Sequence, residues 1–200
     1  LRLAQQIKKR IPTKIIYYIS PQLWAWKARR VNIVKKYIDT MIVLFPFEID
    51  WYQKHNISVK YFGHPLVGDF FEKKSGVSQK KSVYNIALCP GSRQQEIKAH
   101  MPVFIKMIKW AQKNQKDVRF EVFCAPNISE ALLRKYIKTT NVHINHRPIL
   151  ESFSTIDFAV VASGTASLEC ATTLTPMVVV YKMSWFSWKI TKLFVNSSFA

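Results

Sequence analysis

The chain has 200 residues, of which 48% are hydrophobic, including 13 Phe, 8 Tyr and 6 Trp. This composition excludes a largely disordered protein, and the length allows one sizeable core or two smaller ones. Thirty Lys and Arg against twelve Asp and Glu give a formal net charge of +18, an excess that attracts phosphates of a nucleotide, a nucleic acid or an anionic lipid. Because most of the cations are lysines scattered singly, lysine-rich codon usage explains the excess equally well.

Short apolar runs alternate with longer stretches of helical period, a pattern typical of βα units and a mainly parallel sheet. The predicted strands are residues 14–19, 40–45, 59–62, 83–89, 118–124, 142–144, 158–162 and 177–181. The predicted helices are residues 24–37, 46–55, 94–113, 129–138, 149–154, 165–174 and 185–195. Several strands are almost continuously apolar, which indicates an α/β sheet covered by helices on both faces.

A polar, charged segment near residues 72–82 interrupts the apolar periodicity and predicts a linker between two α/β lobes. We therefore expect a first lobe at residues 1–66, a linker at 67–82 and a second lobe at 83–200. No apolar run is long enough to cross a bilayer. Because the chain begins and ends on helical patterns, we expect it to be part of a longer protein.

Three cysteines, Cys89, Cys124 and Cys170, lie in apolar stretches without the spacing of metal ligands. Buried, reduced thiols are expected from this pattern, as in a cytosolic protein.

The first candidate site is the Pro90-Gly91-Ser92-Arg93 turn, which follows a predicted strand and opens a predicted helix. A helix N-terminus presents unpaired N–H groups and a partial positive charge, which suits a phosphate. Gly91 lets the backbone approach a ligand, Ser92 can cap the helix with Glu96 later in its first turn, and Arg93 can grip two oxygens at once. Taken alone, such a turn more often means an ordinary capped helix.

The second candidate, Ser163-Gly164-Thr165, repeats this arrangement after another predicted strand. Glu169 follows one helical turn later, where a carboxylate can accept hydrogen bonds from a ribose diol; the alternative is a solvated helix residue. Because ligands bind at the carboxyl ends of parallel strands, two glycine turns in one lobe predict a nucleotide-diphosphate site.

Histidines and tryptophans outside these turns have two interpretations each. His64, in a Gly-His-Pro turn before the linker, either touches phosphate or sugar in a cleft or is a structural hinge residue. Trp24 opens a basic predicted helix and either packs in the core, on one face with Ala28 and Val31, or lines an acceptor site. Surface positions are predicted for the other histidines, which are His55, His100, His143 and His146. The aromatic and lysine-rich helix at 185–195 suits a membrane interface or a buried surface equally.

Five motifs occur in a fixed order along the chain. They are Ser20-Pro21-Gln22-Leu23-Trp24-Ala25-Trp26, Leu44-Phe45-Pro46-Phe47-Glu48, Phe62-Gly63-His64-Pro65, Leu88-Cys89-Pro90-Gly91-Ser92-Arg93 and Ala162-Ser163-Gly164-Thr165-Ala166-Ser167-Leu168-Glu169-Cys170. This order resembles that of the lipid-A-disaccharide synthases, peripheral inner-membrane glycosyltransferases of lipopolysaccharide synthesis in Gram-negative bacteria. The resemblance extends from the first residues to Val195.

The resemblance implies a GT-B fold with two Rossmann-like lobes, the first of them incomplete. The second lobe would bind the UDP of UDP-2,3-diacylglucosamine, and the 6-hydroxyl of 2,3-diacylglucosamine 1-phosphate would displace UDP to give a β-1,6 lipid A disaccharide. No metal or other cofactor is implied, and Arg93 would stabilise the leaving group. The implied substrate-binding residues are Gly91, Ser92, Arg93, Ser163, Gly164, Thr165, Glu169, His64 and Trp24.

The resemblance also implies a peripheral protein at the anionic, cytoplasmic face of the inner membrane, a homodimer when full length, and no nucleic-acid partner. The general base of the family lies upstream of Leu1, so the isolated chain is expected to be inactive. Three alternatives stay open: another UDP-sugar enzyme of this fold (an N-acetylglucosaminyl transferase or a 2-epimerase), a basic nucleic-acid-binding module, and a membrane-surface scaffold without catalysis.

Overall fold

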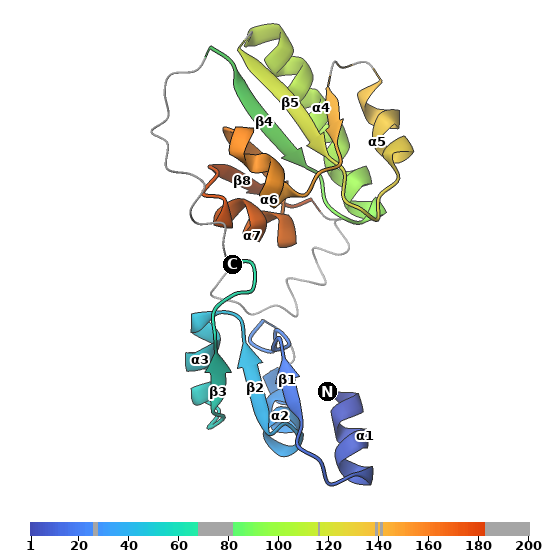
Figure 1. Cartoon of the computed structure of the whole chain (residues 1–200). Helices are drawn as coiled ribbons and strands as arrows, with labels where there is room; N and C mark the ends of the chain where they lie inside the picture. Colours follow the sequence, from blue (N-terminus) through green and yellow to red (C-terminus); the bar gives the residue numbers. More distant parts are fainter. Residues whose placement is uncertain (26–27, 68–81, 116, 139, 141, 183–200) are drawn as a thin grey trace. The chain divides into compact units, whose positions relative to one another are not determined.

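The computed structural model describes residues 1–25, 28–67, 82–115, 117–138, 140 and 142–182. The chain forms two compact units, Leu1–Pro65 and Leu66–Ser184 (Figure 1). Almost all of the predicted linker and the whole predicted helix at 185–195 lie outside the described residues. Within the described residues, no helix is both long and apolar enough to span a bilayer.

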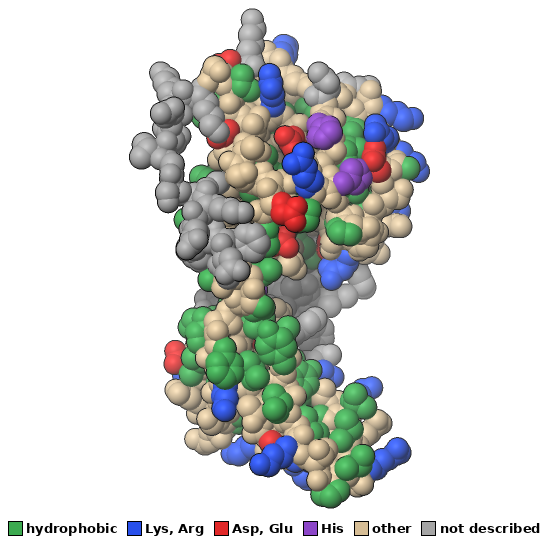
Figure 2. All heavy atoms as spheres, viewed as in Figure 1, with side chains coloured by type: hydrophobic (Ala, Val, Ile, Leu, Met, Phe, Trp, Pro, Cys, Tyr) green, Lys and Arg blue, Asp and Glu red, His purple; other side chains and the backbone are tan. Residues whose placement is uncertain are grey.

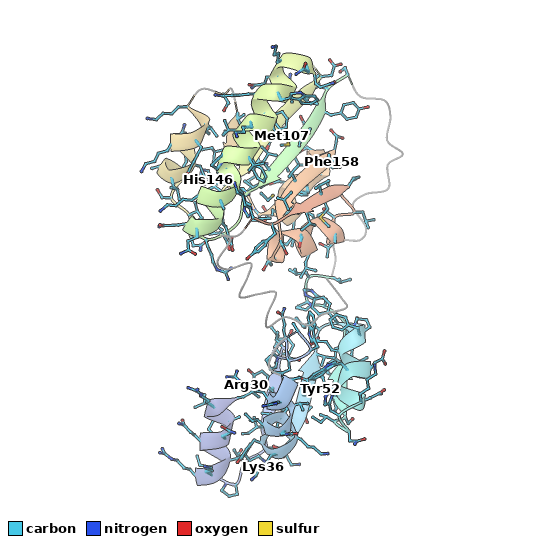
Figure 3. The ribbon with its side chains drawn as sticks, turned by 180° about the vertical axis from the view of Figure 1, so that it is seen from behind. Arg30, Lys36, Tyr52, Met107, His146 and Phe158 are labelled. Atoms are coloured by element: carbon cyan, nitrogen blue, oxygen red, sulfur yellow. The ribbon has the colours of Figure 1, made fainter. Side chains whose placement is uncertain are left out.

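The first unit is built on a three-stranded parallel sheet in the order β1-β2-β3. Its elements are α1 (Arg2–Arg10), β1 (Ile16–Tyr18), the 3-10 helix η1 (Ala28–Arg30), α2 (Val31–Tyr37), β2 (Thr40–Val43), α3 (Pro46–Gln53) and β3 (Val59–Tyr61). Tyr52 of α3, labelled in Figure 3, is fully buried in the core, and its hydroxyl lies 3.0 Å from that of Ser20. The remaining buried core residues are Leu23, Val31, Val34, Met41 and Val43.

A buried carboxylate closes the N-terminus of α3. The amides of Leu44 and Phe45 each donate a hydrogen bond of 3.1 Å to Glu48 Oε2. Pro46 occupies the first helical position, where a missing N–H costs nothing. Glu48 thus satisfies two amides that the helix itself cannot pair.

The second unit is built on a five-stranded parallel sheet in the order β6-β5-β4-β7-β8. Its elements are β4 (Tyr84–Cys89), α4 (Gln94–Asn114), β5 (Val118–Phe123), α5 (Glu130–Ile137), β6 (His143–Asn145), α6 (Ile149–Ser152), η3 (Phe153–Thr155), β7 (Phe158–Ala162), α7 (Thr165–Thr172) and β8 (Met177–Val180). In register, Cys89 lies opposite Val161, and Ala162 opposite Val180. The turns that follow β4, β7 and β8 therefore lie side by side at the carboxyl ends of the strands.

Helices cover both faces of this sheet, and alternating side chains of β4 serve both. Leu88 faces a core shared with α4 and α5, whereas Ala87 and Cys89 face a second core shared with η3 and α7. Met107 of α4 and Phe158 of β7, labelled in Figure 3, pack against the first of these cores. Burial on both faces explains why the strands are almost continuously apolar.

The structure confirms an α/β protein with parallel sheets, and all eight predicted strands are present. The predicted helix start at residue 24 is wrong, because Trp24 and Ala25 lie in a turn and the first helical residue among those described is Ala28. Trp24 instead lies in a turn in which the Ala25 amide donates to the Gln22 carbonyl. The Trp24 ring packs edge-on against the Phe47 ring, with 5.1 Å between ring centroids. Trp24 is therefore not a helical residue on a common face with Val31.

Candidate nucleotide-binding site

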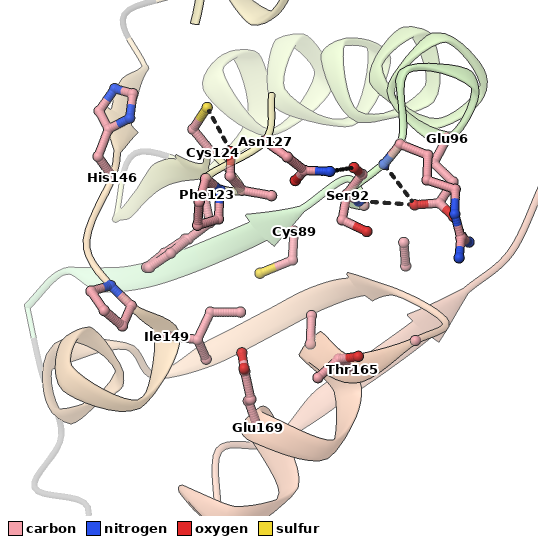
Figure 4. A pocket seen from close by; sticks show the side chains of 18 of the residues that line it. Cys89, Ser92, Glu96, Phe123, Cys124, Asn127, His146, Ile149, Thr165 and Glu169 are labelled. Atoms are coloured by element: carbon pink, nitrogen blue, oxygen red, sulfur yellow. Dashed lines mark hydrogen bonds and ion pairs between the residues drawn. The ribbon is translucent and has the colours of Figure 1, made fainter. Parts of the chain in front are cut away.

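A cavity of about 410 Å³ lies at the carboxyl ends of β4, β5, β6 and β7. Both predicted glycine turns line it, together with the segments that follow β5 and β6 (Figure 4). The lining residues predicted from sequence are Gly91, Ser92, Arg93, Ser163, Gly164, Thr165 and Glu169. The sheet therefore brings together two turns that are more than 70 residues apart in the chain.

Glu169 points its carboxylate from α7 into this cavity (Figure 4). The residue is partly buried, and burial raises the pKa of its carboxyl above the ordinary value of 4.5. A carboxylate in this position has lost part of its hydration and gains from hydroxyl donors supplied by a ligand. Partial burial favours the prediction of a ligand-facing Glu169 over that of a solvated helix residue.

The N-terminus of α4 differs from the expectation of amides open to a phosphate. Glu96 Oε2 already accepts hydrogen bonds from the Ser92 amide at 2.9 Å and the Arg93 amide at 3.2 Å. Arg93, not Ser92, is the N-cap residue, and no side-chain oxygen of Ser92 caps the helix. Glu96 occupies the place of an anion here, as Glu48 does at α3.

The backbone conformation and the packing at Gly91 require glycine, independently of any ligand. Its φ of +119° is unfavourable for residues with a side chain. A Cβ built on Gly91 would collide with the Glu96 carboxylate and come within 2.7 Å of the Glu96 Cβ. The close approach that the sequence predicted at this glycine is thus made by a side chain of the protein itself.

Arg93 extends from this turn with 79% of its side chain exposed. One guanidinium nitrogen, Nη1, lies 2.8 Å from Glu96 Oε1. The ion pair holds one terminal nitrogen of the guanidinium, and the exposure of the side chain leaves the rest accessible to a ligand in the cavity.

The N-terminus of α7 is the more favourable anion site of the two. Thr165 and Ala166 begin the helix and line the cavity, and Gly164 precedes them with a φ of +156°. The structure describes every residue of α7, and no acidic residue lies in its first turn. The partial positive charge at this helix end is therefore not neutralised by a carboxylate of its own.

Segments that the sequence did not single out complete the cavity. Asn127, after β5, donates from Nδ2 to the Ser92 carbonyl at 2.8 Å and so ties the two segments together. His146, after β6, lies 2.7 Å from Glu130 and is exposed, as predicted. The same rule that located the glycine turns, the carboxyl ends of parallel strands, would have found these segments. The apolar lining of these two segments suits a flat base and includes Phe123, Ala125, Pro126, Pro148, Ile149 and Leu150.

His64 and Trp24 lie in the first unit and do not line this cavity. The His64 ring packs against Phe45, with 5.5 Å between ring centroids. The three cysteines are buried free thiols, as predicted. Among the described residues, no group of three or more His, Cys, Asp or Glu side chains is arranged to hold a metal ion.

Comparison with known proteins decides the family. The model of the lipid-A-disaccharide synthetase family matches residues 1–200. The chain belongs to the lipid-A-disaccharide synthetase family. It is 39% identical over 207 residues to lipid-A-disaccharide synthase 1 of Legionella pneumophila (strain Lens), covering 100% of this chain and 54% of that protein.

Other family members match over nearly the same share of the chain. The synthase of Coxiella burnetii (strain Dugway 5J108-111) is 34% identical, with 100% of this chain and 54% of that protein covered. The synthase of Anaeromyxobacter sp. (strain K) is 33% identical, with 98% and 53% covered. The chain thus spans about half the length of these relatives. Among solved structures, a spinosyn rhamnosyltransferase complexed with thymidine diphosphate matches with a TM-score of 0.42 and 10% identity, covering 91% of this chain and 60% of that one.

The Glu96 cap gives a prediction for acid stability. Partial burial alone would raise the pKa of Glu96, but hydrogen bonds from the Ser92 and Arg93 amides and the Arg93 guanidinium outweigh it and hold the pKa below 4.5. A depressed carboxyl pKa stabilises the folded state above the unfolded-state pKa, and this stabilisation is lost as pH falls through the folded-state value. We expect the free energy of unfolding of Glu96→Gln to fall less steeply than that of the wild type below about pH 4.5, because the variant has no carboxylate to protonate at this position.

Urea unfolding between pH 3 and pH 7 measures this effect. The exposed Glu151 of α6 provides the control, and Glu151→Gln should keep the wild-type pH profile. An identical acid profile in wild type and Glu96→Gln would contradict the cap.

Proposed function

We propose that the protein containing this chain is an inverting glycosyltransferase that makes the lipid A disaccharide. It transfers 2,3-diacylglucosamine from UDP to the 6-hydroxyl of 2,3-diacylglucosamine 1-phosphate, with release of UDP. The observation that carries the proposal is the family match along all 200 residues, combined with a cavity lined by both glycine turns. In this proposal residues 83–200 belong to the donor-binding lobe, 1–66 to the acceptor side, and 67–82 connect them.

The diphosphate of UDP is assigned to the space between the N-terminus of α7 and Arg93. The first turn of α7 offers a partial positive charge and contains no acidic residue, and Arg93 offers an exposed cation that also lines the cavity. The turn before α4 plays a smaller part, because Glu96 already accepts the hydrogen bonds of its Ser92 and Arg93 amides. As the glycosidic bond breaks, negative charge grows on the UDP oxygens, and these groups stabilise it.

The nucleoside is assigned to the other part of the cavity. The Glu169 carboxylate accepts hydrogen bonds from the ribose diol, a role that its partial desolvation favours. The apolar segments after β5 and β6 cover the faces of the uracil ring.

The remaining assignments concern substrates and surroundings. His64 and Trp24 are assigned to the acceptor side, which the first unit would form. The protein would act as a homodimer at the anionic cytoplasmic face of the inner membrane. The cations visible in Figure 2 are spread over both units and do not gather into one tract, which does not favour a nucleic-acid partner.

A product assay with the full-length protein tests the proposed function. Diacylated UDP-glucosamine with the diacylglucosamine 1-phosphate acceptor is expected to yield a disaccharide and UDP in equal amounts. Unacylated UDP-glucosamine should give no disaccharide. Turnover of UDP-N-acetylglucosamine, which carries no lipid acyl chain, would instead identify another UDP-sugar enzyme. That result would overturn the proposal of a lipid substrate.

A further inference from the structure

His100 is a buried histidine that the proposed reaction does not use. It lies on α4, one helical turn after Glu96, and only 2% of its surface is exposed. The sequence predicted a surface position for this residue, and that prediction is wrong. Burial of an imidazole requires partners for both ring nitrogens.

Both ring nitrogens have backbone partners from different parts of the sheet. Nδ1 lies 2.8 Å from the carbonyl oxygen of Pro90, at the start of the glycine turn. Nε2 lies 2.9 Å from the amide nitrogen of Lys182, beyond the end of β8. Because an amide can only donate, Nε2 must be the acceptor, so the ring proton is on Nδ1 and is donated to Pro90.

His100 forms a bridge between two backbone segments whose strands do not pair with each other. Pro90 follows β4 and Lys182 follows β8, and β7 lies between these two strands. Strands two places apart are separated by about 10 Å, too far for a direct backbone hydrogen bond. The imidazole spans the gap, beside the strand that leads into Ser163 and Gly164.

We propose that His100 is a positioning residue whose neutral ring, protonated on Nδ1, ties the Pro90 carbonyl to the Lys182 amide and thereby fixes the glycine turn that carries Arg93. Glu96 holds the amide side of this turn and His100 holds its carbonyl side. The orientation of Arg93 toward the nucleotide then depends on a residue that does not line the cavity. The effect on ligand binding rests on the proposed function, whereas the bridge itself does not.

UDP binding to the full-length protein, followed by calorimetry, tests the positioning role. His100→Phe fills the same space but loses both hydrogen bonds, and it is expected to weaken UDP binding about fivefold. His100→Asn places an amide N–H near the position of Nδ1 and should regain most of the affinity. His100→Gln places its amide near Nε2 and should regain less, because Pro90 stays without its donor.

Ile108→Val is the matched control, because Ile108 is a fully buried α4 residue two turns after His100 whose side chain forms no hydrogen bonds. It should lower the stability of the protein without changing UDP affinity. Unchanged UDP affinity in His100→Phe, an equal loss in Ile108→Val, or no recovery in His100→Asn would overturn the positioning role.

The ring nitrogen spectrum of ¹⁵N-histidine-labelled protein without ligand tests the bridge separately. It should show His100 as a neutral ring protonated on Nδ1, and the Lys182 amide should exchange faster in His100→Phe. A ring protonated on Nε2, or unaltered Lys182 exchange, would overturn the bridge. If wild-type protein binds no UDP, the proposed function fails, and these two measurements still decide whether His100 joins the two segments.

Discussion

Gly91→Ala is expected to destabilise the second unit by about 3 kcal/mol and to abolish measurable UDP binding. The methyl group adds the strain of a left-handed backbone conformation and collides with the Glu96 carboxylate. Displacing Glu96 removes its hydrogen bonds to the Ser92 and Arg93 amides and its ion pair with Arg93. Urea unfolding followed by circular dichroism measures the loss of stability.

Two variants separate the collision from the backbone strain. Gly164 also has a positive φ, but a Cβ there meets nothing within 4 Å, so Gly164→Ala should destabilise the unit less. Removing the obstructing side chain in Gly91→Ala/Glu96→Ala should cost little beyond Gly91→Ala alone, because the contacts of Glu96 are already lost. Additive losses in the double variant would contradict the role assigned to Glu96.

Arg93→Ala is expected to lower kcat of the full-length enzyme about 100-fold, more than it lowers the affinity for UDP. Arg93 lines the cavity to which we assign the diphosphate, and in the proposed reaction negative charge increases there as UDP departs. An interaction that strengthens in the transition state lowers kcat and not merely binding. Steady-state rates at saturating donor, compared with UDP affinity, measure the two effects.

Arg93→Lys and Arg134→Ala serve as controls for this prediction. Arg93→Lys keeps the charge without the planar fork and should recover part of the rate. Arg134 is an exposed cation of α5 that pairs with Glu130 and does not line the cavity, so Arg134→Ala should leave kcat unchanged. An equal rate loss in Arg93→Ala and Arg134→Ala would show that only overall charge matters.

The sheet and its binding edge follow from the sequence because their signals are local and regular. Continuous apolar runs such as Phe158–Ala162 indicate strands covered on both faces, and the structure places helices there. Strand-to-helix turns at the carboxyl ends of parallel strands indicate where a ligand binds. The predictions for Gly91, Gly164 and Glu169 depend only on these two rules, and all three residues line one cavity.

Contacts between distant segments could not be predicted in this way. The burial of His100 depends on the Lys182 amide, which is 82 positions away in the chain. Lys182 follows β8, which is two places from β4, the strand that leads to the helix of His100. The Asn127 side chain reaches the Ser92 carbonyl across 35 positions for a similar reason. A sequence pattern shows which groups can form hydrogen bonds, but the three-dimensional arrangement selects their partners.

Glu96 shows why the glycine turn before α4 was not enough to predict which group binds its amides. The structure places it three residues after the N-cap Arg93, the position of a capping carboxylate, whereas the glycine, serine and arginine before it predict a phosphate site. Both interpretations compete for the same two amides, and the structure gives these amides to Glu96. The assignment of the diphosphate to α7 and Arg93 follows from this competition.

Calorimetric titration of UDP into the full-length wild type, Arg93→Ala and Glu169→Ala tests the central claim most directly. The wild type should bind one UDP per chain. Each variant should bind it at least about tenfold more weakly, equivalent to ~1.4 kcal/mol, because each loses one charged partner of the nucleotide. Equal UDP affinity in all three proteins would contradict a nucleotide site between the two glycine turns.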